Sequence, residues 1–315
     1  MKHKEIFLNN SRQLGTLVGL VFVSAVFWAL SPHFLTISNL INVVQQTSIN
    51  AIIAAGMTFV IISAGIDLSV GSIVAFAGVV LAGAMQAGIA EPIAIFFGLL
   101  VGLICGLSNG LLISYGRLPP FIATLGMMSV ARGAALLYTD GRPVSGFSSD
   151  FRFLATGEIL IFPVTVTIMI IIYAAAYFVL NRTKIGRYTF AIGGNEEAAN
   201  LSGINTRFIK TIIYGISGLL SGFAAVILTA RLNSAQPIAG IMYELDAIAA
   251  VVIGGTSLLG GEGKLSGTLI GALIMGILRN GLNLLGVSSF IQQIIIGLVI
   301  ICAVLIDMAL KKGRK

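Results

Sequence analysis

Ten long apolar stretches take up most of this chain, and they decide the solvent in which it can fold. Hydrophobic residues make up 57% of the 315 residues and charged residues 10%, whereas a soluble domain carries about 25% charged residues. One aqueous globule cannot hide that much apolar surface, so the favoured solvent is lipid. A hydrocarbon core roughly 30 Å thick takes about 20 helical residues to cross. The stretches lie at approximately 14–30, 49–64, 70–87, 92–114, 121–138, 159–180, 212–230, 245–259, 265–285 and 290–309.

These stretches are continuous, and a β-barrel would need short segments of alternating hydrophobicity instead. We therefore predict an all-α polytopic membrane protein with about ten transmembrane helices, forming a single transmembrane domain over residues 1–315. The stretch 245–259 is interrupted by glycine, and short or broken segments are tolerated where protein or a water-filled path surrounds the backbone. The first stretch is longer than the apolar region of a usual secretory signal, which favours an uncleaved first helix over a cleaved leader.

The distribution of positive charge indicates the orientation. If the N-terminus lies inside and the stretches alternate, 14 of the 19 Lys and Arg residues fall on the inner side. Three fall outside and two, Arg132 and Arg279, lie within apolar stretches. Cytoplasmic loops carry such an excess, so we predict both termini in the cytoplasm. The net charge of +7 is then an orientation signal, and no nucleic-acid partner is needed.

Two parts of the sequence resemble each other. Asn-Gly-Leu occurs at 109–111 and 280–282, and each copy is followed by Phe-Ile, at 121–122 and 290–291, and then by glycine. In our topology the two parts start from opposite sides of the membrane, so we predict an inverted repeat. Its halves cover approximately 36–138 and 205–310. The alternative is a chance resemblance between glycine-rich helices.

The residues that catalysis would need are missing from the sequence. The nearest approach to a phosphate-binding loop is GGEGKL at 260–265, which has Leu265 where Ser or Thr should follow the lysine. His3 and His33 are the only histidines, so neither a His-based metal site nor a Ser-His relay can be assembled. We expect no catalytic residue, metal or cofactor. Cys105 and Cys302 both fall in apolar stretches, where packing is their expected role.

Glycine and acidic residues within the apolar stretches each have two possible roles. Ionisable residues at membrane depth are candidates for a transport path, and Asp67 and Asp246 are of this kind. Asp67 also precedes Leu-Ser-Val-Gly-Ser, where an aspartate is a good helix N-cap. We favour the cap over the path for Asp67. The glycines at 98, 102, 106 and 110 form one stripe, for which tight helix or subunit packing is favoured over a ligand role.

One segment, 192–210, is polar although apolar stretches flank it. We predict a break at Gly193-Gly194 and then a short helix that Asn195 caps. Glu196 and Glu197 suit its positive N-terminal end, small side chains keep its surface slim, and Gly203 can end it. Two carboxylates exclude this helix from lipid. A slim exposed helix is suited to insertion into a groove of another protein.

Several motifs together resemble one family, the membrane subunits of ABC importers for monosaccharides, with those for ribose the most similar. The resemblance extends from about residue 36 to the C-terminus. It is carried by SAGIDLSVGS, YTDGRPV, GGNEEAANLSGINT, ARLNSAQP, YELDAIAAVVIGGTSLLGG and NGLNLLGVSS.

The resemblance implies a type II ABC importer-like permease in the bacterial cytoplasmic (inner) membrane. Its members work as homodimers, with a cytoplasmic ABC ATPase subunit and an extracytoplasmic sugar-binding protein. The loop 181–210 would carry the coupling helix, and the ATPase-coupling residues would be Gly194, Asn195, Glu196, Glu197, Ala198, Ala199, Ser202, Gly203 and Ile204. The path would run between the two copies. Candidates to line it are Asp67, Ser69, Ser72, Asn109, Asp246, Asn280, Asn283 and Gln292, each of which could equally make an interhelical hydrogen bond.

Two other kinds of transporter remain open. An ion-coupled secondary sugar transporter would usually place several ionisable residues inside the membrane, and this chain has few at that depth. A passive channel is the third possibility. Neither has a task for an exposed helix at 195–204, which favours the subunit driven by a separate ATPase.

Overall fold

The computed structural model describes the backbone of residues 2–160 and 162–312, and the side chains of residues 14–160, 162–305 and 308. Within this part of the chain nearly all regular structure is helical, as predicted. The helices are α1 (Lys2–Leu30), α2 (Ile37–Ile62), α3 (Val70–Gln86), α4 (Glu91–Ser114), α5 (Pro120–Thr139), α6 (Ser149–Thr156), α7 (Val164–Arg182), α8 (Lys184–Gly194), α9 (Glu196–Leu201), α10 (Thr206–Leu232), α11 (Tyr243–Ile253), α12 (Leu265–Leu284) and α13 (Ser289–Lys312).

Four strands of two residues each join the loops between these helices. They are β1 (Val144–Ser145), β2 (Glu158–Ile159), β3 (Phe162–Pro163) and β4 (Ser234–Ala235). β1 pairs antiparallel with β4, so that Val144 lies opposite Ala235. β2 and β3 form a small hairpin just before α7. The pairing of β1 with β4 joins the loop after α5 to the loop after α10.

The apolar helices confirm a polytopic membrane protein. Among the described residues, six helices are long and apolar enough to span a bilayer: α2, α4, α5, α7, α10 and α12. Shorter apolar helices cover Leu14–Leu30, Val70–Gln86 and Ser289–Leu305. α11 has only 11 residues, a length of about 16 Å, which crosses about half of the hydrocarbon core. The number of about ten crossings stays a prediction.

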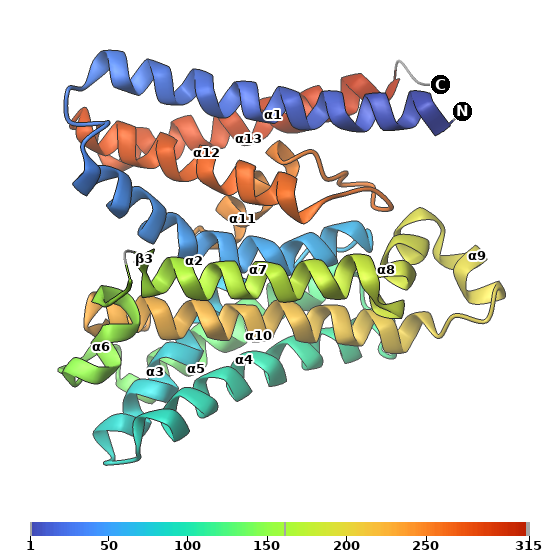
Figure 1. The fold of residues 1–315 in the computed structure, drawn as a ribbon. Helices are drawn as coiled ribbons and strands as arrows, with labels where there is room; N and C mark the ends of the chain where they lie inside the picture. Colours follow the sequence, from blue (N-terminus) through green and yellow to red (C-terminus); the bar gives the residue numbers. More distant parts are fainter. Residues whose placement is uncertain (1, 161, 313–315) are drawn as a thin grey trace.

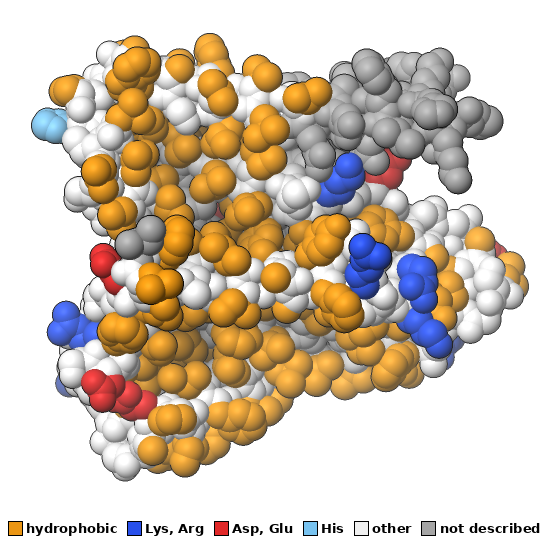
Figure 2. Space-filling view, in the orientation of Figure 1, with side chains coloured by type: hydrophobic (Ala, Val, Ile, Leu, Met, Phe, Trp, Pro, Cys, Tyr) orange, Lys and Arg blue, Asp and Glu red, His pale blue; other side chains and the backbone are white. Residues whose placement is uncertain are grey.

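The long helices lie side by side, with α1, α12 and α13 on one side of the molecule and the other long helices on the other (Figure 1). α8, α9 and both chain termini lie at one end, the α9 end, and α6 lies at the opposite end, the α6 end. Hydrophobic side chains cover the visible long side, whereas charged side chains gather near the two ends (Figure 2). This is the surface of a molecule with lipid around its middle and water at its ends.

The core is built around α2, which packs against α7, α10, α11 and α12. The predicted stretch began at residue 49, but α2 begins at Ile37, because the Thr36 side chain accepts a hydrogen bond from the Asn39 N–H and caps the helix there. The stretch predicted from residue 159 begins instead at Val164, after the hairpin. The stretch 245–259 ends early because Gly254 and Gly255, the latter with φ +87°, turn the chain.

The glycine stripe joins α4 to α10, so helix packing is confirmed for it. A Cβ atom on Gly102 would lie 2.4 Å from the carbonyl oxygen of Gly218, and one on Gly106 would lie 2.3 Å from that of Tyr214. Only glycine permits this approach of two backbones. Packing is also confirmed for Cys105, which is buried, but is wrong for Cys302, which is exposed on α13.

Candidate functional site

The polar segment between α7 and α10 forms a projection at the α9 end of the molecule (Figure 1). As predicted, Asn195 caps α9, because its Oδ1 accepts a 2.8 Å hydrogen bond from the Ala198 N–H. Gly203 ends the segment with φ +84°, a conformation that glycine adopts without strain. The caps define a separate helix of six residues.

The predicted break at Gly193-Gly194 is wrong, because both glycines belong to α8 and the chain breaks at Asn195, which is extended with φ −161°. Gly193 is needed for a close contact instead. A Cβ atom there would lie 1.7 Å from the carbonyl oxygen of Ile62, at the end of α2. The end of α8 is therefore seated directly on the end of α2.

One face of α9 rests on the protein and the other is free in the single chain. Ala199 is 5% exposed, which corrects its prediction as part of the slim outer surface. Glu196, Glu197, Ala198, Ser202 and Gly203 are exposed, and Ile204 is half-buried. Leu201, which the sequence did not single out, is 83% exposed. The projection therefore presents one large apolar side chain on its outer face.

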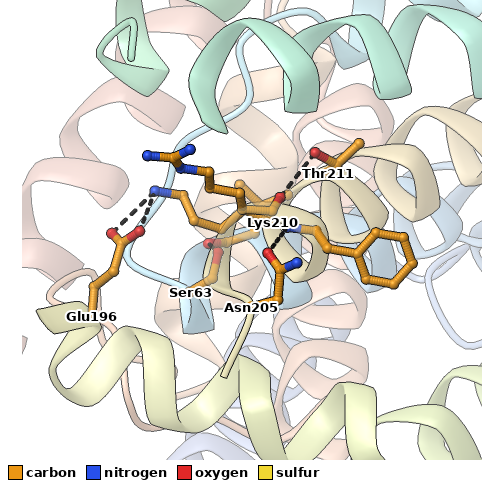
Figure 3. A network of polar contacts seen from close by, with 8 residues as sticks. Ser63, Glu196, Asn205, Lys210 and Thr211 are labelled. Atoms are coloured by element: carbon orange, nitrogen blue, oxygen red, sulfur yellow. Dashed lines mark hydrogen bonds and ion pairs between the residues drawn. The ribbon is translucent and has the colours of Figure 1, made fainter. Parts of the chain in front are cut away.

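A groove of about 550 Å³ lies at the base of α9, between α9, the start of α10 and the loop from α4 to α5. The Lys210 ammonium group forms an ion pair across it with the two carboxylate oxygens of Glu196, at 2.9 and 3.1 Å (Figure 3). Arg117 and Arg207 also line the groove. The ion pair fixes α9 to α10, and the groove has a positive balance of charge.

The α11–α12 loop reaches the same place from the second half of the chain. The Gly261 N–H donates a 2.9 Å hydrogen bond to the carbonyl oxygen of Ile62. Gly260 and Gly261 have φ of +82° and +74°, and a Cβ atom on Gly260 would lie 2.8 Å from the Gly193 carbonyl oxygen. The GGEGK segment is thus a packing element that fits under α8, with its glycines at the points of closest approach.

A second group of candidate residues lies deep in the molecule, where the chain turns back after α2. Asp67 Oδ1 accepts hydrogen bonds from the Ser69 N–H and hydroxyl, at 3.0 and 2.6 Å. Its Oδ2 accepts one from the Ser217 hydroxyl at 2.9 Å, and Asn109 Nδ2 donates to Ser69 Oγ at 2.8 Å. Ser217 is eleven residues into α10, about 16 Å along the helix axis. The segment 63–69 therefore re-enters the molecule and α3 begins near its middle.

Asp67 corrects part of the cap prediction. It accepts from a backbone N–H at the start of α3, but that N–H belongs to Ser69, the cap residue itself, which makes no side-chain cap bond. The other carboxylate oxygen is committed to α10. Asp67 thus satisfies polar groups of a non-helical segment that lipid or a dry core could not satisfy.

The segment 236–242 also re-enters the molecule, from the α6 end, as the segment 63–69 does from the α9 end. Arg132 Nη1 donates 2.7 Å hydrogen bonds to the carbonyl oxygens of Pro237 and Ala239. The N-terminal ends of α3 and α11 then meet, since a Cβ atom on Gly71 would lie 2.1 Å from the Gly240 carbonyl oxygen. The positive ends of two short helices therefore face each other inside the molecule.

Asp246, on the first turn of α11, is paired across the core. Its Oδ2 accepts from Arg279 Nη2 at 2.6 Å and from Asn50 Nδ2 at 3.4 Å. Asp246 is 2% exposed, and its Oδ1 has no hydrogen-bond partner among the described residues. The sequence had placed Arg279 inside an apolar stretch without a partner. The ion pair with Asp246 explains the position of Arg279, because a charge at this depth needs an opposite charge.

The structure brings only some of the predicted path residues together. Asp67, Ser69 and Asn109 form one buried network, and Ser72 is buried beside it on α3. Asn280 exchanges amide hydrogen bonds of 2.9 and 3.0 Å with Asn39.

The last two of the predicted path residues form a separate pair. Gln292 is buried and donates to Asn283 Oδ1 at 2.7 Å, and Asn283 is exposed. Within one chain these residues join helices. Any path that they line therefore requires a second copy or another conformation.

The fold and these sites define a class: a multi-pass helical membrane protein with re-entrant half-helices inside and a short polar helix that projects at one end. More particularly, the chain belongs to the family described as the permease component of the branched-chain amino acid transport system, whose model matches residues 39–304. No solved structure matches the chain.

Curated relatives cover almost the whole length. The ribose import permease of Escherichia coli K12 is 51% identical over 93% of this chain and 92% of its own. The ribose import permease of Bacillus subtilis 168 is 50% identical over 94% of this chain and 92% of its own. The D-allose transport system permease of E. coli K12 is 41% identical over 95% of this chain and 92% of its own. The family description names amino acids, whereas these members are named for sugars.

Proposed function

We propose that this chain is the transmembrane subunit of an ATP-driven importer that moves ribose across the bacterial inner membrane. The observation that carries the proposal is the identity of about half of all residues to ribose import permeases, along more than nine-tenths of both chains. The chain is a non-catalytic permease, and a partner protein hydrolyses ATP. A sugar-binding protein on the outer side delivers the substrate.

Coupling to the ATPase would occur at α9. The helix is exposed, capped and joined to the body by Ala199 and by the ion pair between Glu196 and Lys210. These features support a rigid projection that enters a groove of the ATPase. The contact residues would be Gly194, Asn195, Glu196, Glu197, Ala198, Ser202, Gly203 and Ile204, with Leu201 added and Ala199 serving as the anchor.

The α9 end would face the cytoplasm, and both termini with it. Arg117, Arg207, Lys210 and Lys264 lie in segments at this end, which supports the orientation, since positive residues are concentrated on the cytoplasmic side. Lipid would surround the apolar sides of the molecule. The α6 end, with β1 and β4, would meet the sugar-binding protein.

The functional unit would be a homodimer built from an inverted repeat. The packing of α3 on α4 has its counterpart in α11 on α12, and α10 on α4 has its counterpart in α2 on α12. These matched pairs support halves at approximately 36–138 and 205–310. The sugar would pass between the two copies, along Asp67, Ser69, Ser72, Asn109, Asp246, Asn280, Asn283 and Gln292 as the halves move.

The test is reconstitution in liposomes with a partner ATPase and a partner sugar-binding protein. We expect ATP-dependent uptake of radiolabelled ribose that exceeds uptake of allose and galactose, together with stimulated ATP hydrolysis. Uptake of ribose against its gradient by the chain alone, driven by a proton or sodium gradient, would instead identify an ion-coupled secondary transporter and would refute the proposal.

A further inference from the structure

One furrow on the apolar side of the molecule is not used by the function proposed above. It lies between α7 and α12, has a volume of about 320 Å³, and is lined by apolar side chains. Met169, Ile170, Tyr173 and Tyr177 form its α7 wall, and Leu265 and Leu269 form its α12 wall. α7 and α12 make only sparse direct contact. Something other than these two helices must therefore fill the space between them.

The lining is shaped for a hydrocarbon chain. The Tyr173 ring is buried and its hydroxyl turns inward to donate a 3.0 Å hydrogen bond to the Ala51 carbonyl oxygen of α2. The floor of the furrow is therefore free of the one polar group that Tyr173 carries. Tyr177 is 52% exposed and stands five residues before the end of α7, the level at which tyrosine is enriched in membrane proteins.

The mouth of the furrow is positively charged. Basic side chains lie on both sides of it at the α9 end, over the end of α7 with the start of α8 and beside the loop before α12 (Figure 2). By sequence, Arg182, Lys184 and Arg187 follow the α7 wall, and Lys264 directly precedes the α12 wall. Glu262 is the acidic residue of the same loop. The balance at the mouth is positive.

We propose that this furrow binds an anionic phospholipid of the leaflet at the α9 end, with an acyl chain between α7 and α12 and the phosphate at Lys264 and Arg182. Basic pockets between transmembrane helices are suited to anionic headgroups. A second copy of the chain is a poorer occupant. A two-fold contact through the furrow would bring the same basic mouth of both copies together, and like charges would repel.

The bound lipid would bridge two helices that both pack on α2 but scarcely on each other. α12 packs with α1, α2 and α11, and α7 packs with α2 and α8. An acyl chain held between α7 and α12 therefore supplies van der Waals contact that the protein itself does not make there. The binding is a property of the membrane-inserted chain and does not depend on which sugar it carries.

The test uses tryptophan fluorescence of the full chain in nanodiscs. Trp28 is the only tryptophan, so the background is Trp28→Phe. Tyr177→Trp places a probe in the furrow, and Phe178→Trp is the matched control, an exposed side chain next to it that does not line the furrow. Brominated phosphatidylglycerol or brominated phosphatidylcholine is added at equal amounts as the quencher.

We expect phosphatidylglycerol to quench Tyr177→Trp roughly twofold or more better than phosphatidylcholine, and both lipids to quench Phe178→Trp equally. Adding Arg182→Gln and Lys264→Gln should remove the preference at Tyr177→Trp while the protein stays monodisperse. Equal quenching by both lipids at Tyr177→Trp would overturn the proposal. So would quenching at Phe178→Trp without any at Tyr177→Trp, because protein would then cover the furrow.

Discussion

The hydroxyl of Ser217 donates a 2.9 Å hydrogen bond to Asp67 Oδ2 and so joins the middle of α10 to the segment that re-enters the molecule before α3. Both residues are buried, Asp67 completely. The bond is one of three that α4 and α10 direct at this segment. The others run from Asn109 to Ser69 and from the Tyr214 hydroxyl to the Ile66 carbonyl oxygen. A stretch without helical hydrogen bonds is thereby held at membrane depth.

Loss of this bond should weaken the fold. Ser217→Ala leaves one oxygen of Asp67 without its partner, and we expect a loss of about 1–2 kcal/mol in the free energy of unfolding. Ser221→Ala is the matched control, because its hydroxyl bonds only to the Ser217 carbonyl oxygen within α10. Unfolding in detergent, followed by circular dichroism, measures both. Equal stability of the two variants would show that the bond contributes nothing.

The charge of Asp67 is a separate question from its hydrogen bonds. Asp67→Asn keeps an oxygen for Ser69 and gives Ser217 an amide donor, since the serine hydroxyl can also accept. We expect normal expression and nearly normal ribose uptake for Asp67→Asn, and a clear loss of folded protein for Asp67→Ala. If Asp67→Asn folds normally but transports nothing, the carboxylate charge itself takes part in the path.

The pair of Asp246 and Arg279 should show the penalty of an unmatched buried charge. Arg279→Met leaves Asp246 buried without its cation and should cost about 3–5 kcal/mol of stability. The double variant Arg279→Met with Asp246→Asn removes both charges and should recover much of that loss. Thermal unfolding of the three proteins in detergent measures the coupling. If the double variant is as unstable as Arg279→Met, the unmatched charge is not the cause.

The exposed leucine on α9 offers a test of docking that leaves the fold intact. Leu201→Arg changes a side chain that is 83% exposed, so we expect normal insertion and stability. Assembly with the ATPase should weaken by roughly tenfold or more, because a charge enters the centre of the contact. Leu160→Arg, at the α6 end and 91% exposed, is the control and should bind the ATPase normally. Co-purification and ribose uptake measure the effect, and normal uptake by Leu201→Arg would exclude α9 as the docking helix.

The glycine stripe predicts a difference between two alanine substitutions. Gly106→Ala places a methyl group 2.3 Å from the Tyr214 carbonyl oxygen, so α4 and α10 must separate, at a cost of about 1–3 kcal/mol. Gly126→Ala meets no atom within 4 Å and should be neutral in the single chain. Unfolding midpoints in detergent measure both. Equal midpoints would mean that the two helices adjust without loss.

The sequence predicted what periodic hydrophobicity and local chemistry control. Continuous apolar stretches indicated the helices, and the cap at Asn195 and the turn at Gly203 followed from rules that involve only neighbouring residues. Helix ends were missed where a polar start is stabilised from elsewhere. The first turns of α2, for example, carry Asn39, whose partner Asn280 lies 241 positions away.

The partners inside the molecule could not be predicted from spacing. Nothing near Asp67 in the sequence points to Ser217, and nothing near Arg132 points to the carbonyl groups of Pro237 and Ala239. These contacts depend on how α10 packs on the segment 63–69 and how α5 packs on the segment 236–242. A signal was nevertheless present, because a charged residue inside an apolar stretch requires a partner. The break at Gly193-Gly194 was misjudged since the glycines there serve a close approach and not a turn.

The bond from Gly261 to Ile62 has a mechanical consequence. It ties a loop that follows α11 to the last turn of α2, under the end of α8 that carries α9. Force applied to α9 would pass through main-chain atoms to both halves of the sequence. Long side chains can absorb a displacement by rotating, and backbone contacts cannot. One small movement at the surface would thus reach both the segment that re-enters before α3 and the loop that follows α11.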